Sequence, residues 1–232
     1  MLKHSIPAGI EYGANLLVEY TPDSLWYETS FTIAAGALRD GLKTEYHTFQ
    51  RSPDDVRKNL TRLGLNVKNL EEGGVLRILD SYTSQLGLRG AEEGRLKLSD
   101  ISISQSQKLK AGYAEGEKGW LHIDDNLSVF TRYNSENTIV DWIRTRSIPD
   151  TKAAEGLWIY SLPTGVASDS FYRQCESLSD GIIDFESKEK EGRIEQLVRV
   201  RLLRGQSCDS RWRELRVLEN GEVTLVERSK TV

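Results

Sequence analysis

The sequence predicts an α/β fold: a mostly parallel sheet flanked by helices, with an antiparallel β-hairpin extension at the carboxyl end. Two observations predict the parallel core, because apolar runs typical of buried strands recur along the chain and segments of helical period separate them. A third predicts the extension, since residues 193–228 carry alternating segments around the turn signal Asn220-Gly221. No internal repeat or Pro/Ser linker divides the chain, so we expect one domain over residues 1–232.

The strands of the core are expected at six apolar runs. These runs are Asn15–Glu19, Thr44–Phe49, Leu76–Asp80, Gly119–Asp124, Leu157–Ser161 and Gly181–Glu186. The carboxyl region adds three extended segments, Arg193–Leu203, Glu214–Leu218 and Val223–Val226. Because buried parallel strands are apolar on both faces, the first set is expected inside the sheet and the second at its edge.

Two helices are expected in the amino-terminal half. Residues 25–39 carry apolar positions at helical spacing and stop at Asp40-Gly41, a helix-ending signal. A second helix opens at Ser52, whose hydroxyl is a favoured N-cap, with Pro53 in the first turn and acidic residues facing the helix dipole. It is expected to end near Gly64.

The middle of the chain differs in composition from the rest. Residues 87–119 are rich in Gly, Glu and Ser, which favours a flexible surface excursion. A third helix is expected over Asn134–Arg146, ended by Ile148-Pro149.

Composition excludes several classes of protein. The 31 basic and 35 acidic residues give a net charge of −4, which makes a nucleic-acid partner unlikely. Two cysteines, Cys175 and Cys208, form no C-x-x-C pair, and three histidines show no metal-ligand spacing. No apolar run reaches the ~20 residues that span a bilayer, and the amino terminus has no signal-peptide core. We expect a soluble, cytoplasmic protein with no metal.

The most informative segment lies between the first expected strand and the first expected helix. That is the context of a phosphate-binding loop, G-x-x-x-x-G-K-[ST], in which glycines let backbone N–H groups surround the phosphates. Over residues 20–27, which include Asp23, the chain has Tyr20 and Leu25 at the glycine positions, Trp26 for Lys and Tyr27 for Ser/Thr.

Simple magnitudes show how serious these replacements are. A non-glycine residue in a left-handed bend costs roughly 1–2 kcal/mol, and each lost charge-assisted hydrogen bond roughly 1.5–3 kcal/mol. Together they would cost on the order of 5 kcal/mol, well over a thousandfold in phosphate affinity. We therefore expect no tight ATP binding, no hydrolysis and no cofactor.

Further segments occur in an order and spacing that resemble the RecA-like ATPase superfamily, and within it the KaiC-like proteins. The similarity covers nearly the whole chain. The segments are Gly9–Val18, Leu63–Asn66 with Gly74–Asp80, Gly119–Ser128, Ser179–Phe185 and Arg199–Gly205. The resemblance implies a RecA-like fold in which Asp124 stands at the Walker B acid and Asp125 replaces the Ser that usually follows it.

The chain also departs from this family where the family keeps its other catalytic groups. Gln50 and Arg51 stand where one or two glutamates usually activate water, and Gln is a very poor proton acceptor. In the family, a late K-x-R pair reaches the nucleotide of a neighbouring subunit. Here Leu202 replaces the Lys and Arg204 remains, so a contact of Arg204 with a partner's nucleotide is a hypothesis. The resemblance thus indicates an inactivated member.

Each of these residues also has a structural interpretation. Asp124 is either a remnant of a metal site or an acceptor for backbone N–H groups, the latter being favoured, and Asp125 is expected to be a turn residue. The aromatic pair at 26–27 is either core or a ligand platform. Asp80 and Tyr82, at a strand's carboxyl end, form either a pocket wall or a capped loop. A larger set of arginines is expected to pair with acids such as Glu195 and Glu214; it comprises Arg199, Arg201, Arg204, Arg211, Arg213 and Arg216.

Three functions follow as hypotheses. The leading one is a non-catalytic RecA/KaiC-like protein that acts by contact with a protein partner or as a homo-oligomer, in signal transduction or in regulation of an active ATPase paralogue. The second is a nucleotide-binding ATPase with an unconventional phosphate site, using Asp124. The third is a DNA-associated accessory protein similar to recombinase paralogues, which salt-dependent DNA retention would support.

Overall fold

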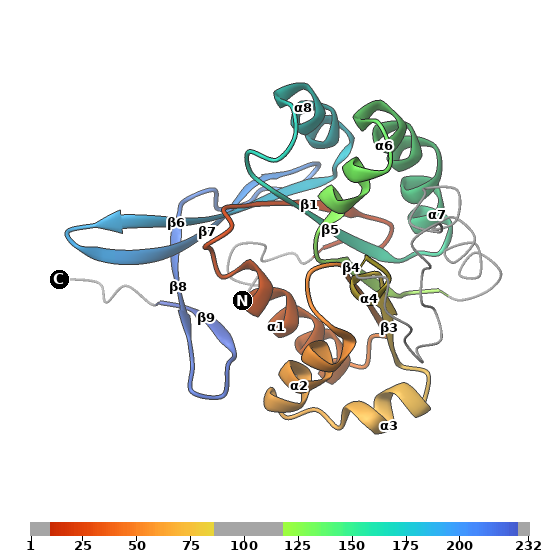
Figure 1. Ribbon diagram of the computed structural model, residues 1–232, viewed down its shortest axis with the longest axis vertical. Coiled ribbons are helices and arrows are strands. Elements are labelled where there is room, and N and C mark those ends of the chain that lie inside the picture. The colour runs from red at the N-terminus through yellow and green to blue at the C-terminus, as the bar shows by residue number, and fades with distance from the viewer. Residues whose placement is uncertain (1–9, 86–117, 227–232) are drawn as a thin grey trace.

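The computed structural model describes residues 10–85 and 118–226, and nearly all of the expected excursion at 87–119 lies outside them. One nine-stranded sheet runs through the molecule in the order β3-β2-β4-β5-β1-β6-β7-β8-β9 (Figure 1). Its parallel strands are β1 (Asn15–Tyr20), β2 (Thr44–Thr48), β3 (Leu76–Asp80), β4 (Leu121–Asp124), β5 (Leu157–Pro163) and β6 (Gly181–Lys190). The antiparallel extension is β7 (Arg193–Leu203), β8 (Arg213–Val217) and β9 (Val223–Leu225). The expected fold class is confirmed.

Helices cover both faces of the sheet (Figure 1). One face carries α1 (Trp26–Arg39), α2 (Pro53–Arg62) and α3 (Val67–Glu72). The other carries α6 (Glu136–Trp142), α7 (Ile148–Ala153) and α8 (Asp169–Leu178). Shorter elements are α4 (Tyr82–Gln85), the 3-10 helix η3 (Leu127–Arg132) and the π-helical turn η4 (Ile143–Ser147).

The core consists of two apolar clusters, one on each side of the sheet. Because side chains alternate along a strand, β1 feeds both of them. Leu16 and Val18 belong to the cluster that contains Ala34 and Ala35 of α1, whereas Leu17 belongs to the other. All are almost completely buried, which positions the carboxyl ends of the strands rigidly between the two helical layers.

The cap expected at Ser52 is present. Its hydroxyl oxygen accepts a hydrogen bond from the Asp55 backbone N–H, and the Asp55 carboxylate accepts one from the Ser52 N–H. Such a reciprocal capping box satisfies two backbone donors that a helix start otherwise leaves unpaired.

The expected helix end at Ile148-Pro149 was wrong. After α6 the chain passes through η4 into α7, and Pro149 lies in the first turn of α7. Proline is tolerated there because its missing N–H falls among those that a helix start does not bond within the helix. Strand β6 likewise runs past the expected end at Glu186 to Lys190, and its hairpin with β7 turns at Glu191 and Gly192, which have φ of 53° and 72°.

Within the described residues, no helix combines the length and apolar character required to cross a bilayer.

Candidate functional site

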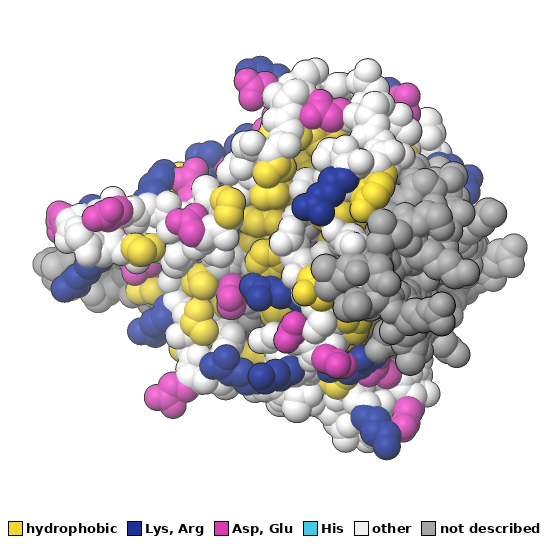
Figure 2. Space-filling view, viewed as in Figure 1, with side chains coloured by type: hydrophobic (Ala, Val, Ile, Leu, Met, Phe, Trp, Pro, Cys, Tyr) yellow, Lys and Arg dark blue, Asp and Glu magenta, His cyan; other side chains and the backbone are white. Residues whose placement is uncertain are grey.

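The carboxyl ends of the central parallel strands meet at one edge of the sheet. Parallel α/β proteins bind ligands at that edge. Here it gathers Tyr20 from β1, the pair Asp124 and Asp125 from the end of β4, and Ser161 from β5. Hydrophobic side chains form a strip down the middle of the face in Figure 2, between the regions of α8 and α1.

Trp26 occupies the centre of this edge and is completely buried. Its indole N–H donates to the Ser161 hydroxyl oxygen at 2.9 Å and to the backbone carbonyl of Asp125 at 3.3 Å. The indole ring packs against Phe185, with the ring centroids 5.4 Å apart. The first turn of α1 is thereby bonded to the ends of β4 and β5.

The loop before α1 follows a path of ordinary backbone angles. Outside glycine, the described residues take positive φ only at Glu155 and Glu191, so no left-handed bend exists between Tyr20 and Tyr27. Strain was expected if these residues adopted the bend of a phosphate loop, and it does not arise because the chain avoids that bend. Instead, the Ser24 N–H donates to the Thr21 carbonyl at 2.9 Å.

A glutamine from β7 closes this loop from outside. The Leu25 N–H donates to the Gln196 side-chain oxygen at 3.1 Å, and the Gln196 amide donates to the Asp23 carbonyl at 3.2 Å. Two backbone groups of the loop are therefore engaged by protein.

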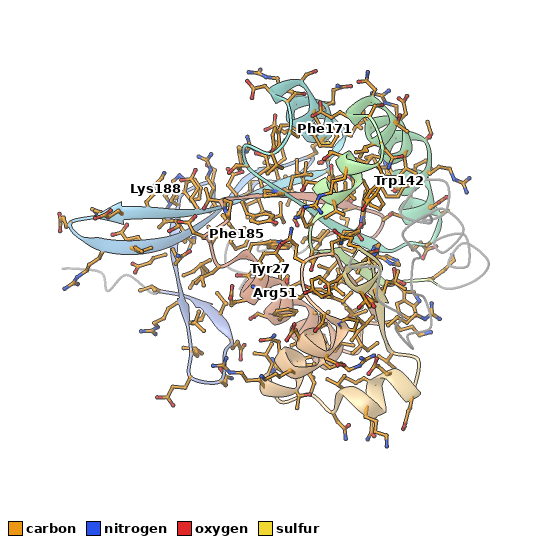
Figure 3. The ribbon with its side chains drawn as sticks, in the orientation of Figure 1. Tyr27, Arg51, Trp142, Phe171, Phe185 and Lys188 are labelled. Carbon is orange, nitrogen blue, oxygen red and sulfur yellow. The ribbon has the colours of Figure 1, made fainter. Side chains whose placement is uncertain are left out.

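Tyr20 packs beside Trp26, and Tyr27 and Arg51 extend this group. The hydroxyl oxygens of Tyr20 and Tyr27 lie 3.1 Å apart, and burial raises the pKa of both phenols, which keeps them neutral. The Arg51 guanidinium lies over the Tyr27 ring, 5.2 Å from its centroid (Figure 3). Arg51 itself is exposed, as is Gln50. The aromatic pair at 26–27 is thus part of the packed structure.

Asp124 is held by two side chains. Its Oδ1 atom lies 3.0 Å from the Nδ1 atom of His47, and its Oδ2 atom accepts a hydrogen bond from the Trp158 indole N–H at 2.7 Å. The other ring nitrogen of His47 lies 2.7 Å from the Ser81 hydroxyl oxygen.

Sequence reasoning missed His47, Ser81 and Trp158. His47 lies in a strand with no motif around it, so its position beside Asp124 depends on the pairing of β2 with β4. The one local signal was a polar residue near the end of a buried strand.

Asp125 is a structural acceptor. Its carboxylate accepts from the Phe49 N–H at 2.8 Å and from the Thr48 hydroxyl at 3.2 Å. Burial raises the pKa of Asp125 to about 7, and these hydrogen bonds partly lower it. It ties the end of β4 to the end of β2.

At the end of β3, the Asp80 carboxylate accepts a hydrogen bond from the Thr83 N–H at 2.8 Å and so caps α4. The geometry agrees with the capped-loop interpretation of Asp80. Tyr82, which is partly buried, begins that short helix.

Arg204 binds within its own chain. Its guanidinium donates to the carbonyls of Ser179, Ser177 and Glu176 at 2.8, 3.3 and 3.4 Å, at the carboxyl end of α8. Cations are favoured at that end of a helix.

The other late arginines are mostly neutralised by acids, although not by the expected Glu195 and Glu214. Their carboxylate partners are Asp184 for Arg199, then Glu19, Glu176 and Asp184 for Arg201, and Asp209 for Arg211 and Arg213. Over the described ranges, no group of three or more His, Cys, Asp or Glu is arranged to hold a metal ion.

Comparisons with known proteins agree with the geometry of the sheet. A family described as "ATPase: KaiC" matches residues 29–229. The fold is similar to a KaiC-like protein of the hyperthermophilic archaeon Pyrococcus horikoshii, with a TM-score of 0.68, 13% identity, and coverage of 97% of this chain and 94% of that one. It is also similar to the flagellar accessory protein FlaH of Methanocaldococcus jannaschii, with a TM-score of 0.75, 13% identity, and coverage of 98% and 95%. A search of curated proteins found no match.

Proposed function

Because the chain belongs to the KaiC family of ATPases, we propose that it is a member that neither binds ATP tightly nor hydrolyses it, and that it acts through protein contacts. The observation that carries the proposal is the buried indole of Trp26, bonded to Ser161 and to the Asp125 carbonyl. A triphosphate needs a cationic side chain and free N–H groups in this place. The family match begins at residue 29, beyond the altered loop.

The acidic groups support the same proposal. Both carboxylate oxygens of Asp124 are engaged by protein groups, His47 and Trp158, so recruiting it to a magnesium ion would break a buried network. Gln50 is a poor proton acceptor, and Arg51 lies against Tyr27. The residues present therefore do not fit a magnesium–nucleotide complex.

The proposed role is that of an accessory or regulatory subunit in signal transduction, contacting an active ATPase paralogue or another copy of this chain. One of the structural relatives is, by its name, an accessory protein. The β6–β7 hairpin extends beyond the rest of the sheet in Figure 1, and it carries Ile194 with 69% of its surface exposed. An exposed large apolar side chain on a projecting arm is suited to burial against a partner. Homo-oligomer formation is the simplest version of this contact.

One observation favours the second hypothesis, phosphate binding by other means. Leu25 gives α1 no side-chain cap, and a helix start attracts anions. Binding there would be weak, because the Leu25 N–H is already bonded to Gln196.

Calorimetric titration with Mg-ATP tests the proposal, with an active KaiC-family ATPase as the positive control. We expect no heat of binding in the micromolar range and no phosphate release. Micromolar affinity would overturn the proposal that the chain does not bind ATP tightly.

The proposal that the chain acts through protein contacts is tested separately by light scattering across a concentration series, alone and with an intact paralogue. A chain that stays monomeric and leaves the paralogue's rate and size unchanged would contradict it.

A further inference from the structure

Four side chains form a continuous line across four neighbouring strands. Ser81 follows β3, His47 lies in β2, Asp124 ends β4 and Trp158 lies in β5, and these strands are adjacent in that order. The Ser81 Oγ and His47 Nε2 atoms are 2.7 Å apart, and the His47 Nδ1 and Asp124 Oδ1 atoms are 3.0 Å apart. The Trp158 indole N–H completes the line at 2.7 Å from Asp124 Oδ2.

One His47 tautomer lets both ring nitrogens form hydrogen bonds in this line. An ionised carboxylate only accepts hydrogen bonds, so the Nδ1 atom of His47 carries its ring hydrogen toward Asp124. With the ring hydrogen on Nδ1, the Nε2 atom has a lone pair that can accept the Ser81 hydroxyl hydrogen across their 2.7 Å separation. Trp158 fixes the carboxylate from the other side. A serine whose proton is directed onto an oriented imidazole is the arrangement of an activated nucleophile.

We propose that Ser81, with His47 as its base and Asp124 as the residue that orients His47, is a nucleophilic serine that accepts acyl groups from small carboxylic esters. The Ser81 oxygen forms a bond to the ester carbonyl carbon, and its proton passes to His47 Nε2. The ester C–O bond breaks, and that proton leaves with the alcohol. Water then attacks the acyl group by the same path, which releases the carboxylic acid and restores the Ser81 hydroxyl.

The surroundings limit the reagent to a small one. Ser81 is completely buried, and Phe49 packs on the His47 ring with centroids 4.0 Å apart. The Phe130 and Phe49 ring centroids are 5.4 Å apart, so this side of the His47 ring is apolar and favours an uncharged acyl group, whereas Gln85 bonds the Ser81 carbonyl on another side. Access requires local opening at α4, which is a single four-residue turn of the kind that opens at low free energy. The proposal goes beyond the function proposed above and does not depend on nucleotide binding.

The first experiment treats the full chain with phenylmethylsulfonyl fluoride and follows intact mass and peptide mapping. We expect one sulfonyl adduct on Ser81, none in Ser81→Ala, and a rate lowered on the order of 100-fold in His47→Gln. Ser179→Ala is the matched control, because Ser179 is equally buried but its hydroxyl bonds to Tyr160. It should be labelled as the wild type is. No adduct on Ser81, or an unchanged rate in His47→Gln with circular dichroism showing an intact fold, would overturn the proposal.

A second experiment uses the variant Ser81→Cys and iodoacetamide, which is smaller than phenylmethylsulfonyl fluoride. In Ser81→Cys the imidazole should hold the introduced thiol partly as thiolate, which is the reactive form. We expect iodoacetamide at neutral pH to alkylate it at least tenfold faster than Cys208 in the same molecule. Cys175 is an internal comparator of a buried thiol, because burial raises its pKa to about 12. A rate at position 81 no higher than that of Cys208 would contradict the assignment. Wild-type hydrolysis of p-nitrophenyl acetate, lost in Ser81→Ala, is the expected catalytic readout.

Discussion

The indole nitrogen of Trp26 lies 2.9 Å from the hydroxyl oxygen of Ser161, and this bond joins the first turn of α1 to β5. The two residues are 135 positions apart in the chain. Around them, Tyr20 and Phe185 complete an aromatic cluster at the carboxyl edge of the sheet. Trp26 is therefore expected to stabilise the folded chain.

Trp26→Ala should lower the free energy of unfolding by about 3–5 kcal/mol, because it leaves a cavity in the core and removes a buried donor. Urea denaturation followed by circular dichroism measures the change. Trp26→Phe is the control that keeps most of the ring volume, and it should cost only about 1–2 kcal/mol. A loss below about 1 kcal/mol for the alanine variant would show that the ring is not part of the core.

Asp125 should make stability fall as pH rises from about 4 to about 7. Burial raises its pKa from 3.8 to about 7 in the folded chain, so between these values the folded state holds a proton that the unfolded state has released. The contribution is fully present below about pH 4 and is lost by pH 7, with a slope of at most about 1.4 kcal/mol per pH unit. The variant Asp125→Asn keeps the shape of the side chain but replaces the carboxyl group with an amide that does not titrate.

The measurement is a set of urea unfolding curves from pH 5 to pH 8 for both chains. The difference in free energy of unfolding between the variant and the wild type should widen from pH 5 to about pH 7, in favour of the variant, and then level off. Parallel pH profiles for the two proteins would exclude Asp125 as the titrating group.

Arg204→Ala should lower the free energy of unfolding by about 1–2 kcal/mol, since three carbonyls at the end of α8 lose a cationic donor. The variant also tests the hypothesis of a trans contact. If Arg204 reaches a partner's nucleotide, the ATPase rate of an intact paralogue mixed with the variant should drop. An unchanged partner rate with lowered stability would restrict Arg204 to its role in α8.

Gly181→Ala should destabilise the fold by about 1–3 kcal/mol, because a Cβ atom at this position would lie 2.7 Å from the Leu16 Cδ2 atom and 3.0 Å from the Leu203 Cδ1 atom. Gly36→Ala in α1 is the matched control. A Cβ there meets nothing within 4 Å, and the change should stabilise the helix by about 0.5–1 kcal/mol. Thermal unfolding of the two variants should shift in opposite directions, and equal shifts would refute the packing argument.

Patterns of consecutive residues were enough to predict most strands of the sheet. The observed bounds of β3 and β7 match the predicted ones, and Ser52 caps α2 as expected. Helix α8 was not predicted, because its apolar positions are few: of its ten residues only Phe171 and Cys175 are buried. Pro149 was predicted to end a helix. The sequence did not reveal that the π-helical turn η4 would precede it and that Pro149 would lie in the first turn of a new helix, α7.

By itself, the sequence determined the α/β class and the antiparallel end, because each of these depends on neighbours along the chain. Only the tertiary structure decided that Trp26 bonds Ser161, that Asp124 is held between His47 and Trp158, and that Ser81 faces His47. These contacts depend on strand order: β4 lies between β2 and β5. Hydrogen bonds across a sheet join residues that the chain separates, so no local pattern records them.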